Sequence, residues 1–175
     1  LFADLIKTTQ NDKTMNKTYL VIISLIVAMG GFLLGFDSAV ISGAVNGIKT
    51  QFSMTDVQLG FAVGCVIFGA MFGNISAGPL ADRFGRKSVL LVTAILFMLS
   101  AAWSAMATSY VTFVIARILG GIGVGAAILI APIYIAEIAP AKLRGSLVSF
   151  NQLNIVIGIS VAYFSNYALV NISDE

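Results

Sequence analysis

Five long apolar stretches dominate this sequence of 175 residues, near residues 20–48, 57–80, 88–107, 110–136 and 146–170. Each is long enough to cross the ~30 Å hydrocarbon core of a bilayer as a helix, which takes about 20 residues. An open strand exposed to lipid would leave backbone groups unpaired, so helices are expected for all five. The sequence therefore predicts an all-α, polytopic membrane helical bundle with very short connections.

The composition excludes an ordinary soluble protein. Apolar side chains make up 58% of the sequence and charged ones 10%, whereas soluble domains average about 45–50% and about 25%. The net charge of +2 is too small to indicate nucleic-acid binding, and the absence of histidine removes imidazole metal sites. We therefore expect no nucleic-acid partner, no metal and no cofactor, and the single Cys65 cannot form an internal disulfide.

The lysines and arginines predict the orientation. Eight of the ten fall on one predicted side of the bundle, namely Lys7, Lys13, Lys17, Arg83, Arg86, Lys87, Lys142 and Arg144. By the positive-inside rule, residues 1–18 are cytoplasmic, residues 19–171 form the bundle in the cell (inner) membrane, and residues 172–175 lie outside. Because the sequence begins at Leu1 rather than methionine, we expect it to be a piece of a longer chain.

Glycines recur at a spacing that brings membrane helices together. Small residues four apart let helix backbones approach closely. Three such pairs occur, Gly60 with Gly64, Gly69 with Gly73, and Gly121 with Gly125. We expect all three to lie at contacts within a tightly packed bundle.

Asp37 and Arg117 are the ionisable residues most clearly embedded in the apolar stretches. A lone charge at the middle of a membrane helix costs about 2.5–3.5 kcal/mol on insertion scales, so each is expected to have a partner or an aqueous cavity. Their predicted depths are compatible with pairing. The pair either fixes helix packing only, or acts as a coupling site in which Asp37 binds a proton and Arg117 senses the change.

Three amides stand in the segment FNQLN at 150–154, namely Asn151, Gln152 and Asn154. An amide can donate to one hydroxyl and accept from the next, which suits the neighbouring hydroxyls of a sugar. Hydrogen bonding between helices is the alternative interpretation, and it is the favoured one for Asn151 and Asn154.

Two predicted cytoplasmic connections are rich in charge, GPLADRFGRK at 78–87 and AEIAPAKLRG at 136–145. Their basic residues can simply enforce topology. Asp82 and Glu137 lie beside predicted helix ends, however, so carboxylates that face arginines across the mouth of the bundle are a second possibility.

Together these segments identify a family. GFDSAVISGA, GPLADRFGRK, RILGGIGVG, PIYIAEIAPAKLRG and FNQLNIVIGI occur in the order found in the sugar porter family of the major facilitator superfamily, and the sequence most closely resembles its bacterial proton-coupled symporters. The resemblance spans residues from about 20 to 170. It implies twelve spans in two six-helix halves, of which this chain would be most of the N-terminal half, without the sixth span and the C-terminal half.

The resemblance also implies residue roles. Asp37 matches the carboxylate that binds the proton, Arg117 its partner, and Gln152 a glutamine that binds the sugar. Ile159 stands where the xylose carriers have a second glutamine, and it resembles the glucose carriers there. The residues that match the cytoplasmic gate are Asp82, Arg83, Glu137 and Arg144.

The expected function is proton-coupled symport of a monosaccharide, a hexose or a pentose, by alternating access, and not an enzymatic reaction. The expected partners are the monosaccharide, the proton as coupling ion, the lipid bilayer and the C-terminal half of the carrier. Three alternatives remain, a facilitative sugar transporter without coupling, a sugar sensor that binds without transporting, and a small channel made from several copies of this chain. The channel is disfavoured because no continuous polar stripe follows one helix.

Overall fold

A computed structural model describes residues 17–140 and 143–173. This part of the chain forms five helices and no strand, in the order α2 (Lys17–Gln51), α3 (Asp56–Phe84), α4 (Arg86–Ala105), α5 (Tyr110–Ile138) and α6 (Arg144–Ser173). The predicted all-α fold is confirmed, although α3 continues to Phe84 instead of ending near residue 80 and α4 ends before residue 107. Most of the predicted segment 1–18, Lys142 and the last two residues lie outside the described residues.

The outer surface of the bundle is apolar. Each of the five helices includes a stretch long and apolar enough to cross a membrane. Large apolar side chains are exposed along the helices, among them Phe72, Ile75, Met98 and Phe164. Soluble proteins rarely expose contiguous apolar patches of this extent, so the surface is typical of one that faces lipid.

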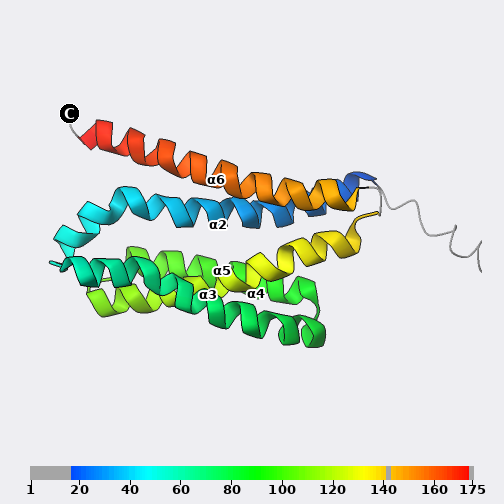
Figure 1. The fold of residues 1–175 in the computed structure, drawn as a ribbon, viewed down its shortest axis with the longest axis horizontal. Coiled ribbons are helices and arrows are strands. Elements are labelled where there is room, and N and C mark those ends of the chain that lie inside the picture. Colours follow the sequence, from blue (N-terminus) through cyan, green and yellow to red (C-terminus); the bar gives the residue numbers. More distant parts are fainter. Residues whose placement is uncertain (1–16, 141–142, 174–175) are drawn as a thin grey trace, which may run out of the picture.

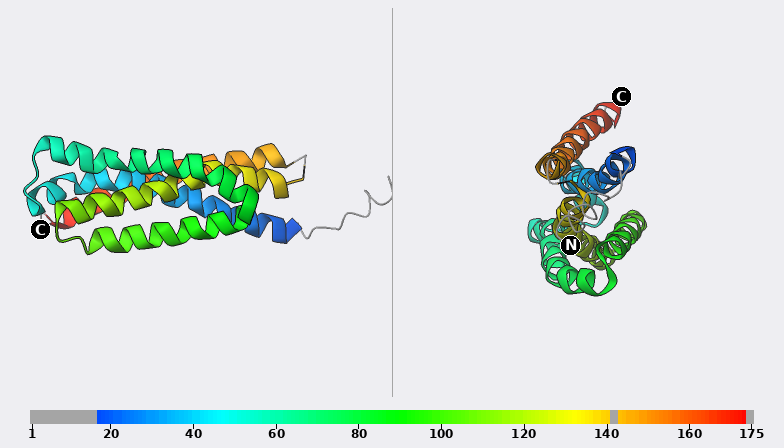
Figure 2. Two further views of the ribbon diagram at one scale, coloured as in Figure 1. Left: turned by 90° about the horizontal axis from the view of Figure 1, so that it is seen from below. Right: turned by 90° about the vertical axis from the view of Figure 1, so that its right-hand side faces the viewer.

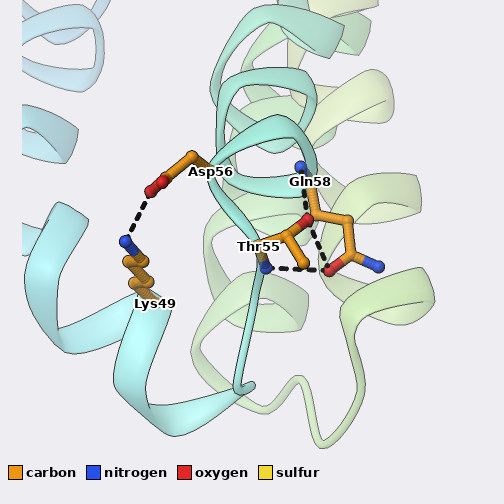
Figure 3. Close-up of polar contacts among 4 residues, drawn as sticks. All are labelled: Lys49, Thr55, Asp56 and Gln58. Carbon is orange, nitrogen blue, oxygen red and sulfur yellow. Dashed lines mark hydrogen bonds and ion pairs between the residues drawn. The ribbon is translucent and has the colours of Figure 1, made fainter.

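Capping boxes begin two of the helices. Before α3, Gln58 N donates to Thr55 Oγ1 at 3.3 Å, and Thr55 N donates to Gln58 Oε1 at 3.0 Å (Figure 3). Ser109 and Thr112 form the same arrangement before α5. Such caps satisfy backbone donors that a helix start leaves free. Lys49 near the end of α2 also pairs with Asp56, which ties α2 to the start of α3 (Figure 3).

The connection between α3 and α4 is a single glycine. Gly85 has a φ of 84°, in the left-handed region that glycine adopts without strain. This turn ends α3 and starts α4 at Arg86, so Asp82 and Arg86 lie close together on either side of the break. Pro132 lies inside α5, which continues to Ile138, and the chain leaves the helix before Pro140.

α5 is the central helix of the bundle. It packs extensively against α3 and α4, while α2 and α6 pack against each other and touch α5 less extensively. Figure 1 shows α2 and α6 side by side, with α3, α4 and α5 grouped next to them, and the end-on view in Figure 2 separates the same two groups. α5 is accordingly the helix with the largest buried share.

Glycines allow the closest helix contacts, but not at every predicted position. A Cβ at Gly73 of α3 would lie 2.1 Å from the carbonyl oxygen of Ile122, and one at Gly125 of α5 would lie 2.0 Å from that of Ala70. The contacts predicted for Gly69 with Gly73 and for Gly121 with Gly125 are therefore confirmed. The prediction is wrong for Gly60 and Gly64, which lie on another face of α3, where no described residue comes within 4 Å of an added Cβ.

Candidate functional site

Asp37 and Arg117 form an ion pair inside the bundle. Arg117 Nη1 on α5 donates to Asp37 Oδ1 on α2 at 2.9 Å. The side chain of Arg117 is only 10% exposed, whereas that of Asp37 is 34% exposed. The two residues predicted to pair are thus in contact, and the carboxylate is the partner that is open to its surroundings.

The position of Arg117 follows from the packing of α5. Gly69 of α3 lies against the carbonyl oxygen of Ile118, the residue after Arg117, where an added Cβ would be 2.2 Å away. Cys65 on α3 is also buried, and its thiol donates to the carbonyl oxygen of Ala62 at 3.2 Å. Arg117 Nε is buried and has no hydrogen-bond partner among the described residues. Asp37 therefore supplies the ionic contact of this guanidinium within the described structure.

A small hollow lies between α2, α5 and α6. Its walls are mainly small and apolar, and its polar side chains are the amides of Asn151 and Gln152. The remaining lining residues are Gly30, Gly31, Leu34, Ala127, Ile128, Ala131 and Ile155. An apolar hollow with a few polar groups is the usual form of a small-molecule site.

The three amides of the FNQLN segment differ in their surroundings. Gln152 is exposed in the hollow and free to meet a ligand. Asn151 is 4% exposed, and its Oδ1 has no partner among the described residues. Asn154 donates to the carbonyl oxygen of Phe150 at 3.2 Å, a contact within its own helix. Ile159 is partly buried and is not among the residues that line the hollow.

A second group of charges lies where α3, α4 and α5 meet at the predicted cytoplasmic end. Arg86 Nε donates to Glu137 Oε1 at 2.9 Å, and Arg86 Nη2 lies 3.2 Å from Asp82 Oδ1. Arg86 was not among the predicted gate residues, yet it joins the two carboxylates that were. The spacing of four between Asp82 and Arg86 was the signal in the sequence.

The two predicted gate arginines do not join this group in the structure. The guanidinium of Arg83 lies over the ring of Phe84, 5.4 Å from its centroid. Arg144 is exposed at the first position of α6. Neither forms an ion pair within residues 17–140 and 143–173.

These features define a membrane protein of several spans, with a charge pair and a mainly apolar hollow that contains two amides inside its helical bundle. The sequence profile described as "Sugar (and other) transporter" matches residues 23–175. The chain belongs to this family, the sugar porters of the major facilitator superfamily, whose members are transporters and not enzymes.

Similar proteins include sugar carriers. A glucose transport protein of Synechocystis sp. is 44% identical over 91% of this chain and 34% of its own length. The D-xylose-proton symporter of Escherichia coli is 38% identical over 91% of this chain and 38% of its own length. The structure of a proton:xylose symporter bound to 6-bromo-6-deoxy-D-glucose superposes with a TM-score of 0.81 at 37% identity, covering 89% of this chain and 38% of that one. The chain thus spans about a third of the length of these relatives.

Proposed function

We propose that this chain forms most of the N-terminal bundle of a proton-coupled monosaccharide symporter that works by alternating access. Such carriers rock two bundles about a shared central site, so the second bundle would be supplied by the rest of the carrier. The single observation that carries the proposal is the Asp37–Arg117 pair, an ionisable pair inside a transmembrane bundle with its carboxylate open on one side.

Asp37 is proposed as the proton-binding group and Arg117 as its partner. A nearby cation lowers the proton affinity of a carboxylate, and that affinity rises when the cation withdraws. Arg117 is held by the glycine contact between α3 and α5, whereas Asp37 belongs to the other group of helices. A movement of α2 and α6 relative to α3, α4 and α5 would therefore change the distance between Asp37 and Arg117. The affinity of Asp37 for the proton would change with that distance.

Gln152 is proposed to bind the sugar within the hollow. Its amide provides both donors and an acceptor, which matches adjacent hydroxyls of a hexose or pentose. Small residues of α2 and α5 line the hollow beside it. Ile159 is proposed to influence which sugar is accepted from about two helical turns further along α6, as its position in the resemblance implies.

Asp82, Arg83, Glu137 and Arg144 are proposed to form a cytoplasmic gate, and we add Arg86 because it contacts both carboxylates. The same proposal places the carrier in the cell membrane with the N-terminus of this chain in the cytoplasm. The excess of basic residues at that end supports this orientation. We expect no cofactor besides the coupling proton.

The experiment compares the full-length carrier with its Asp37→Asn variant in proteoliposomes, with and without an imposed pH gradient. Asparagine keeps the size and an acceptor for Arg117 but cannot release a proton. We expect accumulation of sugar against its gradient to disappear, while sugar exchange continues because exchange does not require the proton to leave. Gradient-driven accumulation by the variant would contradict the coupling role. If sugar accumulation by the unaltered carrier is as insensitive to the pH gradient as that of the variant, a facilitative transporter is favoured instead.

A further inference from the structure

Asn166 connects α6 to α2 close to Asp37. Its side chain donates from Nδ2 to the carbonyl oxygens of Ala39 at 3.4 Å and Val40 at 3.3 Å. Both carbonyls belong to the turn of α2 that follows Asp37. The Ala39 carbonyl also accepts from Ser42 Oγ at 2.7 Å, so side-chain donors converge on this turn.

Gly43 provides the space that Asn166 occupies. A Cβ at Gly43 would lie 2.2 Å from Cγ of Asn166, which is too close for both groups to keep their positions. One turn further along α2, no described residue lies within 4 Å of a Cβ added at Gly47. The amide of Asn166 therefore fits against α2 because residue 43 has no side chain.

α2 and α6 also approach each other closely at a second place, before Asp37 on α2. A Cβ at Gly35 would lie 2.1 Å from the carbonyl oxygen of Ile155, and one at Gly158 would lie 2.2 Å from that of Phe32. Asp37 lies between this glycine contact and the Asn166 contact. The segment of α2 that carries Asp37 is thus held on both sides by α6, the helix that carries Gln152.

We propose that Asn166 is a positioning residue for proton coupling, which ties the Asp37 segment of α2 to the sugar-binding helix α6. This inference rests on the proposed function. Arg117 on α5 is the charged group in contact with Asp37, and Cys65 on α3 is the ionisable group near Arg117. Besides Arg144, the ionisable side chains of α6 are Tyr163 and Tyr167, and both are exposed. Asn166 accordingly acts through the distance between Asp37 and Arg117, because the energy between two charges depends on their separation.

Two variants of the full-length carrier remove this contact in different ways. Asn166→Ala deletes the amide, and Gly43→Ala keeps the amide but displaces it from α2. Each has a matched control. Asn154→Ala deletes an α6 amide that bonds to its own helix, and Gly47→Ala adds the same methyl group to open space on α2. The readouts are proton-driven accumulation, its pH profile and sugar exchange, all measured in proteoliposomes.

We expect both test variants to lower accumulation by about 2- to 10-fold. This is the factor by which one intramolecular hydrogen bond typically changes an equilibrium constant. Their pH profiles should be displaced in the same direction, while exchange and both controls stay close to the unaltered carrier. If Asn166→Ala and Gly43→Ala still accumulate sugar with an unchanged pH profile, the role of Asn166 is overturned while the proposed function stands. A lack of proton-driven accumulation in the unaltered carrier would overturn the proposed function and this role together.

Discussion

Two arginine–carboxylate contacts in this molecule have the same length but different surroundings. Arg117 and Asp37 meet at 2.9 Å in the interior, and Arg86 and Glu137 meet at 2.9 Å at the end of the bundle. The arginine side chain is 10% exposed in the first contact and 34% exposed in the second. The energy of a charge pair rises steeply as water is excluded, so burial rather than length decides what each contact contributes.

The surrounding helices differ in the same way. Arg117 lies on the most buried helix, at a level where glycines bring α3 and α5 together. Arg86 is the first residue of α4, directly after the Gly85 turn. The interior pair is therefore held by backbone packing on both sides of the contact, whereas the end pair depends on a short connection and on the side chains themselves.

The largest expected effect is that of removing the interior carboxylate. Asp37→Ala leaves Arg117 buried without its anionic partner, and breaking a buried pair on one side costs about 3–5 kcal/mol. Because Asp37 is 34% exposed, we expect a loss of stability of about 2–4 kcal/mol, after a discount for screening by solvent. Thermal unfolding of the full-length carrier in detergent measures it.

Asp37→Asn is the control for this prediction. The asparagine keeps an oxygen that accepts from Arg117, so its melting temperature should remain well above that of Asp37→Ala. Equal melting temperatures for the two variants would show that the contact is not important for stability and that the interior resembles the exposed end.

A smaller effect is expected when the packing around Arg117 is changed and the charges are kept. Gly69→Ala places a methyl group 2.2 Å from the carbonyl oxygen of Ile118, so α3 and α5 must separate. Overpacking of this kind typically costs about 1–3 kcal/mol. We expect a lower melting temperature and slower sugar exchange, because Arg117 moves with Ile118.

Gly64→Ala is the matched control on the same helix, since the added methyl group has no neighbour within 4 Å in the described part of the chain. It should leave both readouts unchanged or raise stability slightly through helix propensity. If Gly69→Ala and Gly64→Ala behave alike, the glycine contact does not determine the position of Arg117.

The sequence predicted the helices and the interior contact for related reasons. Length and hydropathy determine membrane helices because lipid offers no partner for a free backbone group. The same lack of partners makes an embedded charge conspicuous, so Asp37 and Arg117 stood out and their depths indicated pairing. In both cases the cost of an unsatisfied group in lipid restricts the possible structures to very few.

That restriction is missing where the structure shows contacts that the sequence did not predict. At the exposed end many pairings have similar energies, and the identity of the arginine between Asp82 and Glu137 depends on the geometry of the Gly85 turn. Asn166 was missed because its donors meet backbone carbonyls, which no side-chain pattern reveals. The two faces of α3, with Gly69 packed and Gly64 open, likewise depend on the rotation of the helix.

The smallest expected effect is that of Arg86→Ala, which removes the end contact altogether. Asp82 and Glu137 have side-chain exposures of 74% and 45%, so neither carboxylate is left buried when the arginine is lost. Exposed ion pairs contribute about 0–1 kcal/mol, and salt screens them. We expect a small decrease in melting temperature at low salt that disappears at high salt.

A large decrease in melting temperature for Arg86→Ala, equal at low and high salt, would contradict this prediction and remove the contrast between the two contacts. It would mean that the charges are shielded from water in the full-length carrier by groups outside this chain. Because the proposed gate requires a second bundle to close against this end, the same measurement also tests whether the gate residues are covered. If the change in melting temperature depends on salt, the gate residues are in contact with water for most of the time. If it does not, they lie within a closed interface.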